Sequence, residues 1–511
     1  MPGNNNLFSR LTENVKNTKN EFIALPDGRV YRYCDMFELT SRYANALKTI
    51  GIRKNDRVLA QTEKQIECIW LYLACLRIGA IYITINPAYT LTETKYFISD
   101  SKPKLFVITE FNKHAELLEL CKTLGEIIVK DLKNTGNNSI CALASLESTE
   151  FETCVNNNED IAAILYTSGT TGRSKGALIS HQNLFSNAKT LSDIWQMSSS
   201  DKLLHILPIY HTHGLFVAFN STLYAGGSIL FHKKFLVDEV IRDISKVTIL
   251  MGVPTHYIRL ISERKFSKQL TSKMRLFISG SAPLSSEVYS NFKKITGLEI
   301  LERYGMTETN MITSNPYNGE RKSGTVGVPL PDVIVRIRDI ETGKLNENGS
   351  VGSIEVKGPN VFSGYWKMEE RAKIDFQKDG FFITGDLGFF DSDGYLNISG
   401  RDKDLIISGG LNVYPAEVEQ VLDALPEVSE SALIGLPHPD FGEGVTAVIT
   451  LSDKQSTLNE QELRGRISEQ LASFKVPLTI KVKERLPKNA MGKIQKNLLR
   501  TEFESIYSKK S

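Results

Sequence analysis

Short apolar segments alternate with helix-like segments through the larger, N-terminal part of this chain. The apolar segments have the length of buried strands and lie at residues 57–61, 81–85, 104–109, 161–165, 229–231, 248–251 and 276–278. Helical patterns such as 66–78 and 285–294 lie between them. Because parallel strands need crossover connections that are usually helices, this order predicts an α/β fold of parallel or mixed β-sheets flanked by helices.

The pattern changes twice toward the C-terminus. From Gly327 short strands alternate with Gly/Asp turns, which predicts a β-rich subdomain that closes the large domain. After Arg401 the remaining chain has the pattern and the size of one compact α+β domain. A chain of 511 residues is also too long for a single hydrophobic core. We therefore predict a large domain at 1–400, a hinge at 401–403 and a small C-terminal domain at 404–511.

The composition excludes several classes of protein. A net charge of +2 argues against a nucleic-acid partner, and no run reaches the length of about 18 apolar residues that suggests a membrane span. The six cysteines form no C-x-x-C pair, and the N-terminus lacks the apolar core of a secretory signal. The chain ends in Ser-Lys-Lys-Ser, which is not a peroxisomal signal. These features predict a cytoplasmic protein with reduced thiols, and they leave its oligomeric state open.

A segment rich in glycine and hydroxyl groups directly follows the apolar run at 161–165. It reads Tyr166-Thr-Ser-Gly-Thr-Thr-Gly-Arg-Ser-Lys-Gly176. Glycines let backbone amides approach an anion, hydroxyls donate to phosphate oxygens, and Arg173 and Lys175 add positive charge. A Walker A loop needs Ser or Thr after its lysine, but Gly176 follows Lys175, so the spacing excludes a P-loop NTPase. A flexible surface turn is the other interpretation of such a composition.

The ordered core of this segment resembles the nucleotide loop of the adenylate-forming superfamily, which includes the acyl-CoA synthetases. Further strings occur in the order that this superfamily shows, and the resemblance covers almost the whole chain. They are Gly280-Ser-Ala-Pro283, Glu302-Arg-Tyr-Gly-Met-Thr-Glu308, Thr384-Gly-Asp386, Gly400-Arg401, Ser408-Gly-Gly410 and Asn489-Ala-Met-Gly-Lys493. The resemblance implies that ATP and Mg²⁺ activate a carboxylic acid, which then forms a thioester with CoA.

The resemblance also implies roles for the residues around ATP. Thr307 would contact the α-phosphate, Glu308 and Thr167 would hold Mg²⁺, and Lys493 would bridge the attacking carboxylate and the α-phosphate. The β- and γ-phosphates would be held by Thr167, Ser168, Gly169, Thr170, Thr171, Gly172, Arg173, Ser174, Lys175 and Gly176. The adenine and ribose would be held by Gly280, Ser281, Ala282, Glu302, Arg303, Tyr304, Gly305, Met306, Asp386 and Arg401.

Two features imply that the small domain is mobile and that a thiol reaches the site. Lys403 occupies the hinge position of the superfamily, although a plain exposed linker charge is compatible with the same role. Ser408, Gly409 and Gly410 would border the pantetheine path of CoA. Their presence favours thioester formation over a purely adenylating or light-emitting enzyme.

The acid is the most specific part of the prediction. Members that take aromatic or fatty acids have glycine before Tyr-Gly-x-Thr-Glu, but this chain has Arg303. A buried guanidinium needs an anion, so a substrate with a second carboxylate is expected. Arg259 lies on a helix that lines the same pocket in relatives, and His211 matches the gate position beside the reacting carboxylate. For His213 a structural, hydrogen-bonded role is the more probable interpretation.

Whole strings around these residues resemble the malonate-activating members of the superfamily. They include His-Thr-His-Gly-Leu-Phe-Val-Ala at 211–218 and Phe-Ile-Ser-Gly-Ser-Ala-Pro-Leu at 277–284. The resemblance implies malonate as substrate, with methylmalonate tolerated because one methyl group changes binding by only about 1–3 kcal/mol. A ligase for an aromatic or medium-chain acid is the first alternative, and the two arginines disfavour it. A non-enzymatic ATP-binding regulator is the second, and the retained Lys493, Glu308 and Asp386 disfavour it.

Overall fold

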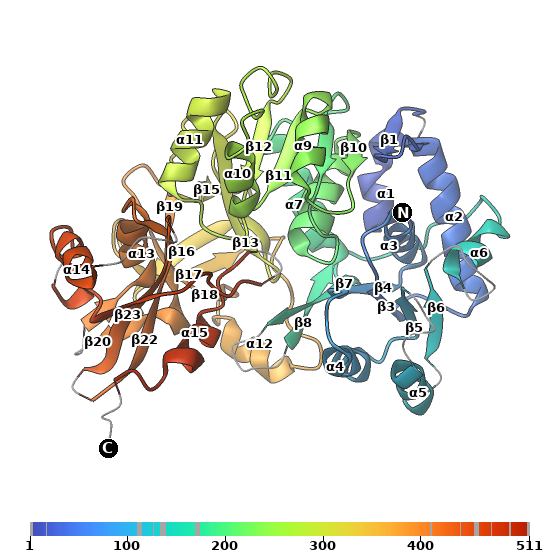
Figure 1. Ribbon diagram of the computed structural model, residues 1–511. Helices are drawn as coiled ribbons and strands as arrows, with labels where there is room; N and C mark the ends of the chain where they lie inside the picture. Colours follow the sequence, from blue (N-terminus) through green and yellow to red (C-terminus); the bar gives the residue numbers. More distant parts are fainter. Residues whose placement is uncertain are drawn as a thin grey trace.

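The computed structural model describes residues 4–16, 18–109, 115–125, 127–132, 139–168, 174–408, 411–439, 441–453, 459–471, 473–489 and 492–507. Figure 1 shows a large body built from the N-terminal and central parts of the chain and a smaller C-terminal part at its side. The predicted α/β fold is confirmed. No helix among these residues is both long and apolar enough for a membrane span.

The first sheet of the large body carries the predicted phosphate segment. Its strands run in the order β6 (Ile128–Asp131), β5 (Leu105–Ile108), β3 (Arg57–Gln61), β4 (Ile81–Thr84), β7 (Ile161–Ser168) and β8 (Ser174–Ser180). All neighbours are parallel except β7 and β8, which form an antiparallel pair. The accompanying helices are α2 (Tyr33–Thr49), α3 (Ile66–Ile78), α4 (Leu91–Ser101), α5 (Ala115–Thr123) and α6 (Ile140–Ser145). The strands predicted from apolar runs therefore pair as an α/β sheet.

The second sheet holds the centre of the chain. Its order is β15 (Val328–Pro329), β14 (Asn310–Ser314), β13 (Ile300–Met306), β12 (Leu276–Ser279), β11 (Ile249–Gly252), β9 (Lys202–His205), β10 (Ser228–Phe231), β1 (Glu21–Ala24) and β2 (Val30–Arg32). Strands from β13 to β1 are parallel, and β14, β15 and β2 are antiparallel additions at the two ends.

Helices and short helical turns connect the strands of this second sheet. They are α1 (Leu7–Leu11), η1 (Glu13–Val15), α7 (His181–Ile194), the π-helix η3 (His213–Phe219), α8 (Asn220–Tyr224), α9 (Val237–Asp243), η4 (Ile244–Lys246), α10 (Pro254–Ile261) and α11 (Ser286–Thr296). The first turn of α10 begins with Pro254, whose fixed φ suits a helix start. The mixed α/β pattern expected for this region is therefore present.

Two smaller sheets follow, as the change of sequence pattern predicted; their strand pairs are antiparallel except β23 with β24, which is parallel. One has the order β16 (Ile334–Arg338), β17 (Gly352–Lys357), β18 (Phe382–Phe390) and β19 (Leu396–Arg401), with α12 (Glu369–Asp375) beside it. The other has the order β21 (Leu411–Val413), β20 (Ile406–Ser408), β23 (Gly442–Leu451) and β22 (Val428–His438), and β24 (Thr479–Val482) pairs with β23. Its companions are η5 (Asp402–Asp404), α13 (Pro415–Asp423), α14 (Glu460–Ser468), η6 (Ser473–Lys475) and α15 (Lys496–Phe503). The exact domain boundaries and the mobility of this part stay predictions.

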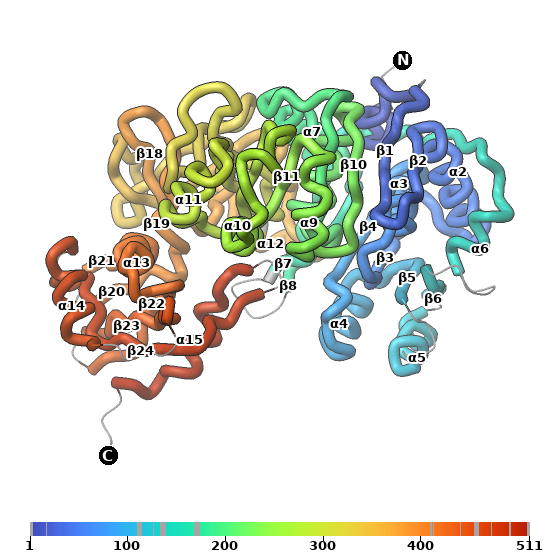
Figure 2. The backbone as a smooth tube through the Cα atoms, turned by 45° about the horizontal axis from the view of Figure 1, so that its top comes forward, coloured from blue at the N-terminus to red at the C-terminus, as the bar shows by residue number. Residues whose placement is uncertain are grey.

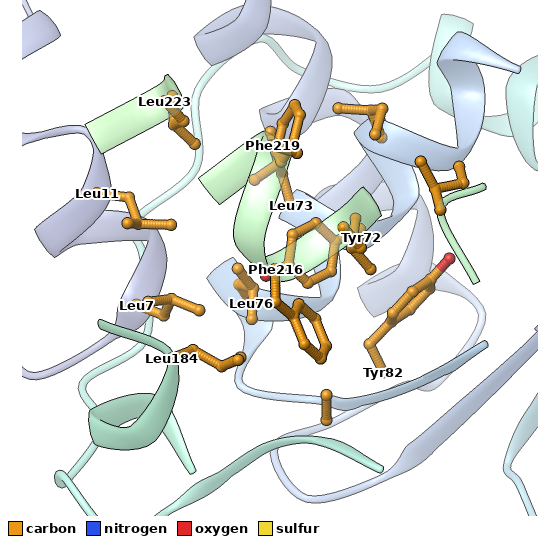
Figure 3. Close-up of a cluster of buried hydrophobic side chains, with 14 of the residues drawn as sticks. Leu7, Leu11, Tyr72, Leu73, Leu76, Tyr82, Leu184, Phe216, Phe219 and Leu223 are labelled. Atoms are coloured by element: carbon orange, nitrogen blue, oxygen red, sulfur yellow. The ribbon is translucent and has the colours of Figure 1, made fainter. Parts of the chain in front are cut away.

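The main hydrophobic core lies between the first two sheets. Helix α3 runs through it, and every residue of α3 except Glu67 is buried. Figure 3 shows how side chains from several elements meet there, with Tyr72 and Leu76 of α3 packed near Phe216 and Phe219 of η3. The C-terminal sheet has its own core, which includes Leu433 and Val445. The core therefore holds the two large sheets in a fixed relation, and the π-helix is part of it.

Trp195 at the end of α7 provides a test of this packing. Its side chain is fully buried, and its indole nitrogen donates to the Ser314 hydroxyl of β14 at 3.0 Å. Trp195→Ala should lower the free energy of unfolding by about 3–5 kcal/mol, because a large cavity forms. Denaturant unfolding followed by circular dichroism measures this. Trp195→Phe, which keeps most of the volume, is the control and should cost less. Equal losses for both variants would show that cavity formation is not the cause.

Candidate active site

The β7–β8 hairpin presents the predicted phosphate segment. Thr167 pairs with Lys175 and Ser168 with Ser174, so the segment joins two antiparallel strands and no helix follows it directly. The tip, Gly169, Thr170, Thr171, Gly172 and Arg173, lies outside the described residues. Gly176 packs so closely that an added Cβ would lie 2.8 Å from Ile164. The hairpin geometry separates this segment from a Walker A loop, which joins a strand to a helix.

Glu308 is the buried carboxylate nearest to this hairpin. It lies in the turn between β13 and β14, beside the half-buried Thr307. Its Oε1 accepts hydrogen bonds from Thr167 Oγ1 at 3.3 Å and from the Tyr365 hydroxyl at 2.9 Å. Burial raises the pKa of Glu308. A carboxylate and a hydroxyl are hard oxygen donors, so Glu308 and Thr167 fit a Mg²⁺ ion that would take its other ligands from phosphates and water.

Lys175 faces the same carboxylate from β8. Its side chain is buried, and its Nζ lies 5.0 Å from the centre of the Tyr365 ring. Burial lowers the pKa of Lys175, and the nearby Arg371 lowers it further. Tyr365 therefore connects two predicted site residues, although its own sequence context gives no signal for such a role.

Asp386 and Arg401 meet because their strands pair. They are register partners on β18 and β19, and Arg401 Nε lies 2.6 Å from Asp386 Oδ1. The Tyr304 hydroxyl donates to the other carboxylate oxygen, Oδ2. The negative charge of Asp386 raises the pKa of Arg401. The structure thus brings together three of the residues predicted for the adenosine part of ATP.

The other predicted adenosine residues surround the ends of β12 and β13. Ser281 has a left-handed backbone with φ of 71°, which is uncommon for a residue other than glycine. At Gly305 the β13–β14 pairing shifts register, and an added Cβ would lie 2.0 Å from the Asn310 carbonyl oxygen. Burial raises the pKa of Glu302 to about 8, and its Oε1 has no hydrogen-bond partner among the described residues. Gly280, Ala282 and Met306 belong to the same two segments.

The Lys493 loop reaches this site from the C-terminal part. An added Cβ at Gly492 would lie 3.5 Å from two side-chain atoms of Thr255 on α10, so the loop contacts the large body. Figure 2 shows the chain before α15 extending toward that body. The Lys493 side chain is exposed to solvent, but nearby protein atoms displace part of its water, and this partial desolvation lowers its pKa to about 8. The positive charge of Arg401 lowers the pKa further, whereas Asp386 raises it.

Arg303 is a buried cation in the part of the site that the sequence predicts to bind the acid. Its guanidinium packs directly on Gly280, where an added Cβ would lie 2.3 Å from Arg303 Cζ. Its Nε and Nη2 are buried and have no hydrogen-bond partner among the described residues. Burial lowers the pKa of Arg303 to about 10, so the side chain is still charged at neutral pH. A buried, charged group with two unused donors indicates an anion-binding pocket.

Two histidines lie beside Arg303. Burial lowers the pKa of His211 to about 4, and the charge of Arg303 adds to this, so His211 is neutral. His213 Nδ1 lies 3.2 Å from the Ser281 hydroxyl, while its buried Nε2 has no partner among the described residues. The structural hydrogen bond expected for His213 is present. Sequence reasoning missed the unused nitrogen, for which no pattern in the sequence gives a signal.

The remaining predicted residues lie at the edges of the site. Arg259 is exposed on α10, one turn after Thr255, and forms no ion pair with a carboxylate in the described part of the chain. Lys403 is exposed in η5. Ser408 is buried in β20, whereas Gly409 and Gly410 fall outside the described residues. Asp386 and Arg401 shift the pKa of Lys493, which belongs to the C-terminal part. In this arrangement it is therefore Lys493, and not the Ser408 hairpin, that these two residues influence.

Comparisons with known proteins agree with this geometry. A family model described as AMP-binding enzyme matches residues 11–366, and one described as AMP-binding enzyme C-terminal domain matches residues 417–493. A protein of Arabidopsis thaliana named malonate–CoA ligase is 35% identical over an alignment 462 positions long, which covers 84% of this chain and 74% of that protein. The crystal structure of ATP-bound MatB from Rhodopseudomonas palustris is 49% identical, with 99% of this chain and 100% of that chain covered and a TM-score of 0.96.

The apo structure of the same Rhodopseudomonas palustris protein differs more from this chain. Its sequence identity is also 49% and its coverage is 99% of this chain and 100% of its own, but the TM-score is 0.85. Because the sequence likeness is the same, the lower TM-score reflects a difference in backbone conformation and not in sequence. The arrangement described above is therefore closer to the ATP-bound form of that relative.

The surroundings of Lys493 lead to a prediction about its pKa. Labelling with an amine-reactive anhydride at a series of pH values should give a midpoint near pH 8 for Lys493, read by mass spectrometry. Asp386→Asn should lower that midpoint, because it removes a negative charge and leaves Arg401 unopposed. Arg401→Gln should raise it. A midpoint near the ordinary lysine value of about 10.4 would contradict the desolvation of Lys493 against the large body.

Proposed function

Because this chain belongs to the AMP-binding enzyme family and is an adenylate-forming acid–thiol ligase, we propose that malonate is the acid it activates and that methylmalonate is a secondary substrate. The observation that carries this proposal is the buried Arg303 guanidinium with two unused donors. The malonate–CoA ligase of Arabidopsis thaliana supports the same acid.

The second carboxylate of a short diacid would satisfy the Arg303 pocket. One carboxylate must react at the α-phosphate, so the other has to lie a few bonds away, where Arg303 and His213 present unused nitrogens. A monocarboxylate would leave the guanidinium buried without an anion, which is strongly unfavourable. The exposed Arg259 would add positive charge near the pocket mouth.

The proposed chemistry has two steps. A carboxylate oxygen of malonate attacks the α-phosphorus of ATP, forming malonyl-AMP as the bond to pyrophosphate breaks. The sulfur of CoA then attacks the carbonyl carbon of malonyl-AMP, releasing its thiol proton and AMP and leaving malonyl-CoA. Both steps are displacements by a nucleophile at an electrophilic centre, so no oxidant or reductant is needed.

The first step brings two anions together, and the site supplies charges that offset their repulsion. We assign Lys493 to the attacking carboxylate and the α-phosphate, Thr307 to the α-phosphate, and Asp386 with Arg401 to the ribose. The β7–β8 hairpin would hold the other phosphates. When bound with ATP, Mg²⁺ at Glu308 and Thr167 would neutralise phosphate charge.

The second step needs a different arrangement of the C-terminal part. Lys493 occupies the side of the site next to Asp386 and Arg401. A thiol must enter after adenylation, so we propose that the region 404–511 pivots at Lys403, withdrawing Lys493 and bringing Ser408 with Gly409 and Gly410 to the CoA path. The exposed position of Lys403 in a short 3₁₀ turn supports a pivot there, because few contacts oppose its rotation.

The acid assignment is tested with a panel of substrates. Pyrophosphate release and thioester formation are measured with malonate, methylmalonate, oxalate, succinate, acetate and 4-coumarate. We expect the highest kcat/KM with malonate, a lower value with methylmalonate and little turnover of the monocarboxylates. Highest turnover of acetate or 4-coumarate would overturn the malonate proposal, and a preference for oxalate or succinate would retain the Arg303 argument but change the acid.

Two substitutions test whether Arg303 reads the second carboxylate. Arg303→Gly should lower kcat/KM for malonate by at least about a hundredfold, since two charge-assisted hydrogen bonds are lost. Gly280→Ala leaves the arginine in the chain but places a methyl group where its guanidinium packs. Gly280→Ala should also lower kcat/KM for malonate, and it should change the KM for ATP less than the KM for malonate. Unchanged malonate kinetics in Arg303→Gly would contradict the assignment.

A further inference from the structure

A buried lysine, whose pKa burial holds well below its ordinary value, lies outside the reaction site. Lys64 lies between β3 and α3, and only 8% of it is exposed. Its Nζ is 2.8 Å from His205 Nδ1 and 2.9 Å from the His205 carbonyl oxygen, and it lies 4.4 Å from the centre of the Phe231 ring. No ion pair joins Lys64 to a carboxylate in the described ranges. Burying an amine away from water costs free energy, so it is expected only where the amine holds a neighbouring group in place.

The hydrogen bonds of His205 show which group is the donor in the contact between Lys64 and His205. His205 is the last residue of β9, and its Nε2 lies 2.9 Å from the Gly214 carbonyl oxygen. A carbonyl oxygen only accepts, so Nε2 carries the hydrogen. Burial and the neighbouring Lys64 hold the pKa of His205 well below its ordinary value, so the ring is neutral and its Nδ1 accepts from Lys64. Lys64 therefore donates a hydrogen bond to His205, and His205 donates one to the Gly214 carbonyl oxygen.

Gly214 lies at the start of the π-helix that follows His211. The Gly214 and Leu215 amides both donate to the His211 carbonyl oxygen, at 3.1 and 3.0 Å. The backbone is packed so closely that an added Cβ at Gly214 would lie 2.0 Å from the Pro208 carbonyl oxygen. π-helical turns are rare and occur frequently at functional sites. Close packing and hydrogen bonds thus fix the position of the Gly214 carbonyl within the segment that carries His211 and His213.

We propose that Lys64 is a positioning residue for the acid pocket. By fixing the His205 tautomer, it holds the Gly214 peptide and so places His211 and His213 beside Arg303. Lys64 does not touch the pocket residues itself; it acts through His205. The identity of the acid in this inference rests on the proposed function, but the positioning does not.

The test compares Lys64→Met with a matched control. Arg77→Met removes another buried cation, from α3, whose hydrogen bonds go to α2 and to residues 151–153. Lys64→Met should raise the KM for malonate by about fivefold, the effect of losing one hydrogen-bonded link, with kcat and the KM for ATP nearly unchanged. Arg77→Met should lower the thermal midpoint without changing the KM for malonate.

A second pair of variants acts on His205, in case Lys64→Met does not fold. A glutamine amide can occupy the position of the histidine Nε2 and donate to Gly214, so His205→Gln should keep a KM for malonate close to that of the wild type. His205→Phe has no donor and should match the rise seen with Lys64→Met. Equal KM values in all four variants, or a rise in KM for Arg77→Met as large as for Lys64→Met, would overturn the proposal.

The outcome can be separated from the choice of acid. The kinetic comparison uses whichever acid the wild-type chain turns over best in the panel. A preference for a different acid overturns the malonate proposal, whereas the ratio between Lys64→Met and wild type still decides whether Lys64 positions the pocket.

Discussion

The burial of a charged guanidinium without an anion is the constraint around which the proposed acid pocket is organised. Arg303 keeps a pKa of about 10 in a place where water cannot solvate it. The surrounding chain makes room for it only because residue 280 is glycine. A pocket of this kind is unfavourable when empty and becomes favourable when an anion enters, so it discriminates by charge before it discriminates by shape.

Strand β13 connects this pocket with the nucleotide side of the site. Successive side chains of a strand point to opposite faces. Tyr304 donates to Asp386, whereas the neighbouring Arg303 packs on Gly280 and affects the pKa of His211 and His213. In the proposed assignment, one short segment serves both the nucleotide and the acid, and the backbone fixes the spacing between its two sets of side chains. A displacement of β13 would disturb both at once.

The sequence predicted the parts of the molecule that local pattern determines. Apolar runs located seven strands of the two large sheets (β3, β4, β5, β7, β10, β11 and β12) but not the others. The Asp386 and Arg401 strings are adjacent because β18 and β19 form an antiparallel pair. Contacts between distant segments were not predictable in this way. Tyr365 reaches Glu308 and Lys175 only after folding, and Lys64 meets His205 across 141 positions. No periodicity or motif carries such pairings.

The environment of Lys493 makes its charge depend on the ligands. With a pKa of about 8, lowered by desolvation and by Arg401, the side chain is mostly an ammonium at pH 7, and a large neutral fraction appears as the pH approaches 8. A phosphate and a carboxylate arriving beside it would raise that pKa, because nearby negative charge favours the charged amine. The cation would therefore be fully formed when two anions must be brought together, and the free enzyme would not have to keep it fully charged beside Arg401.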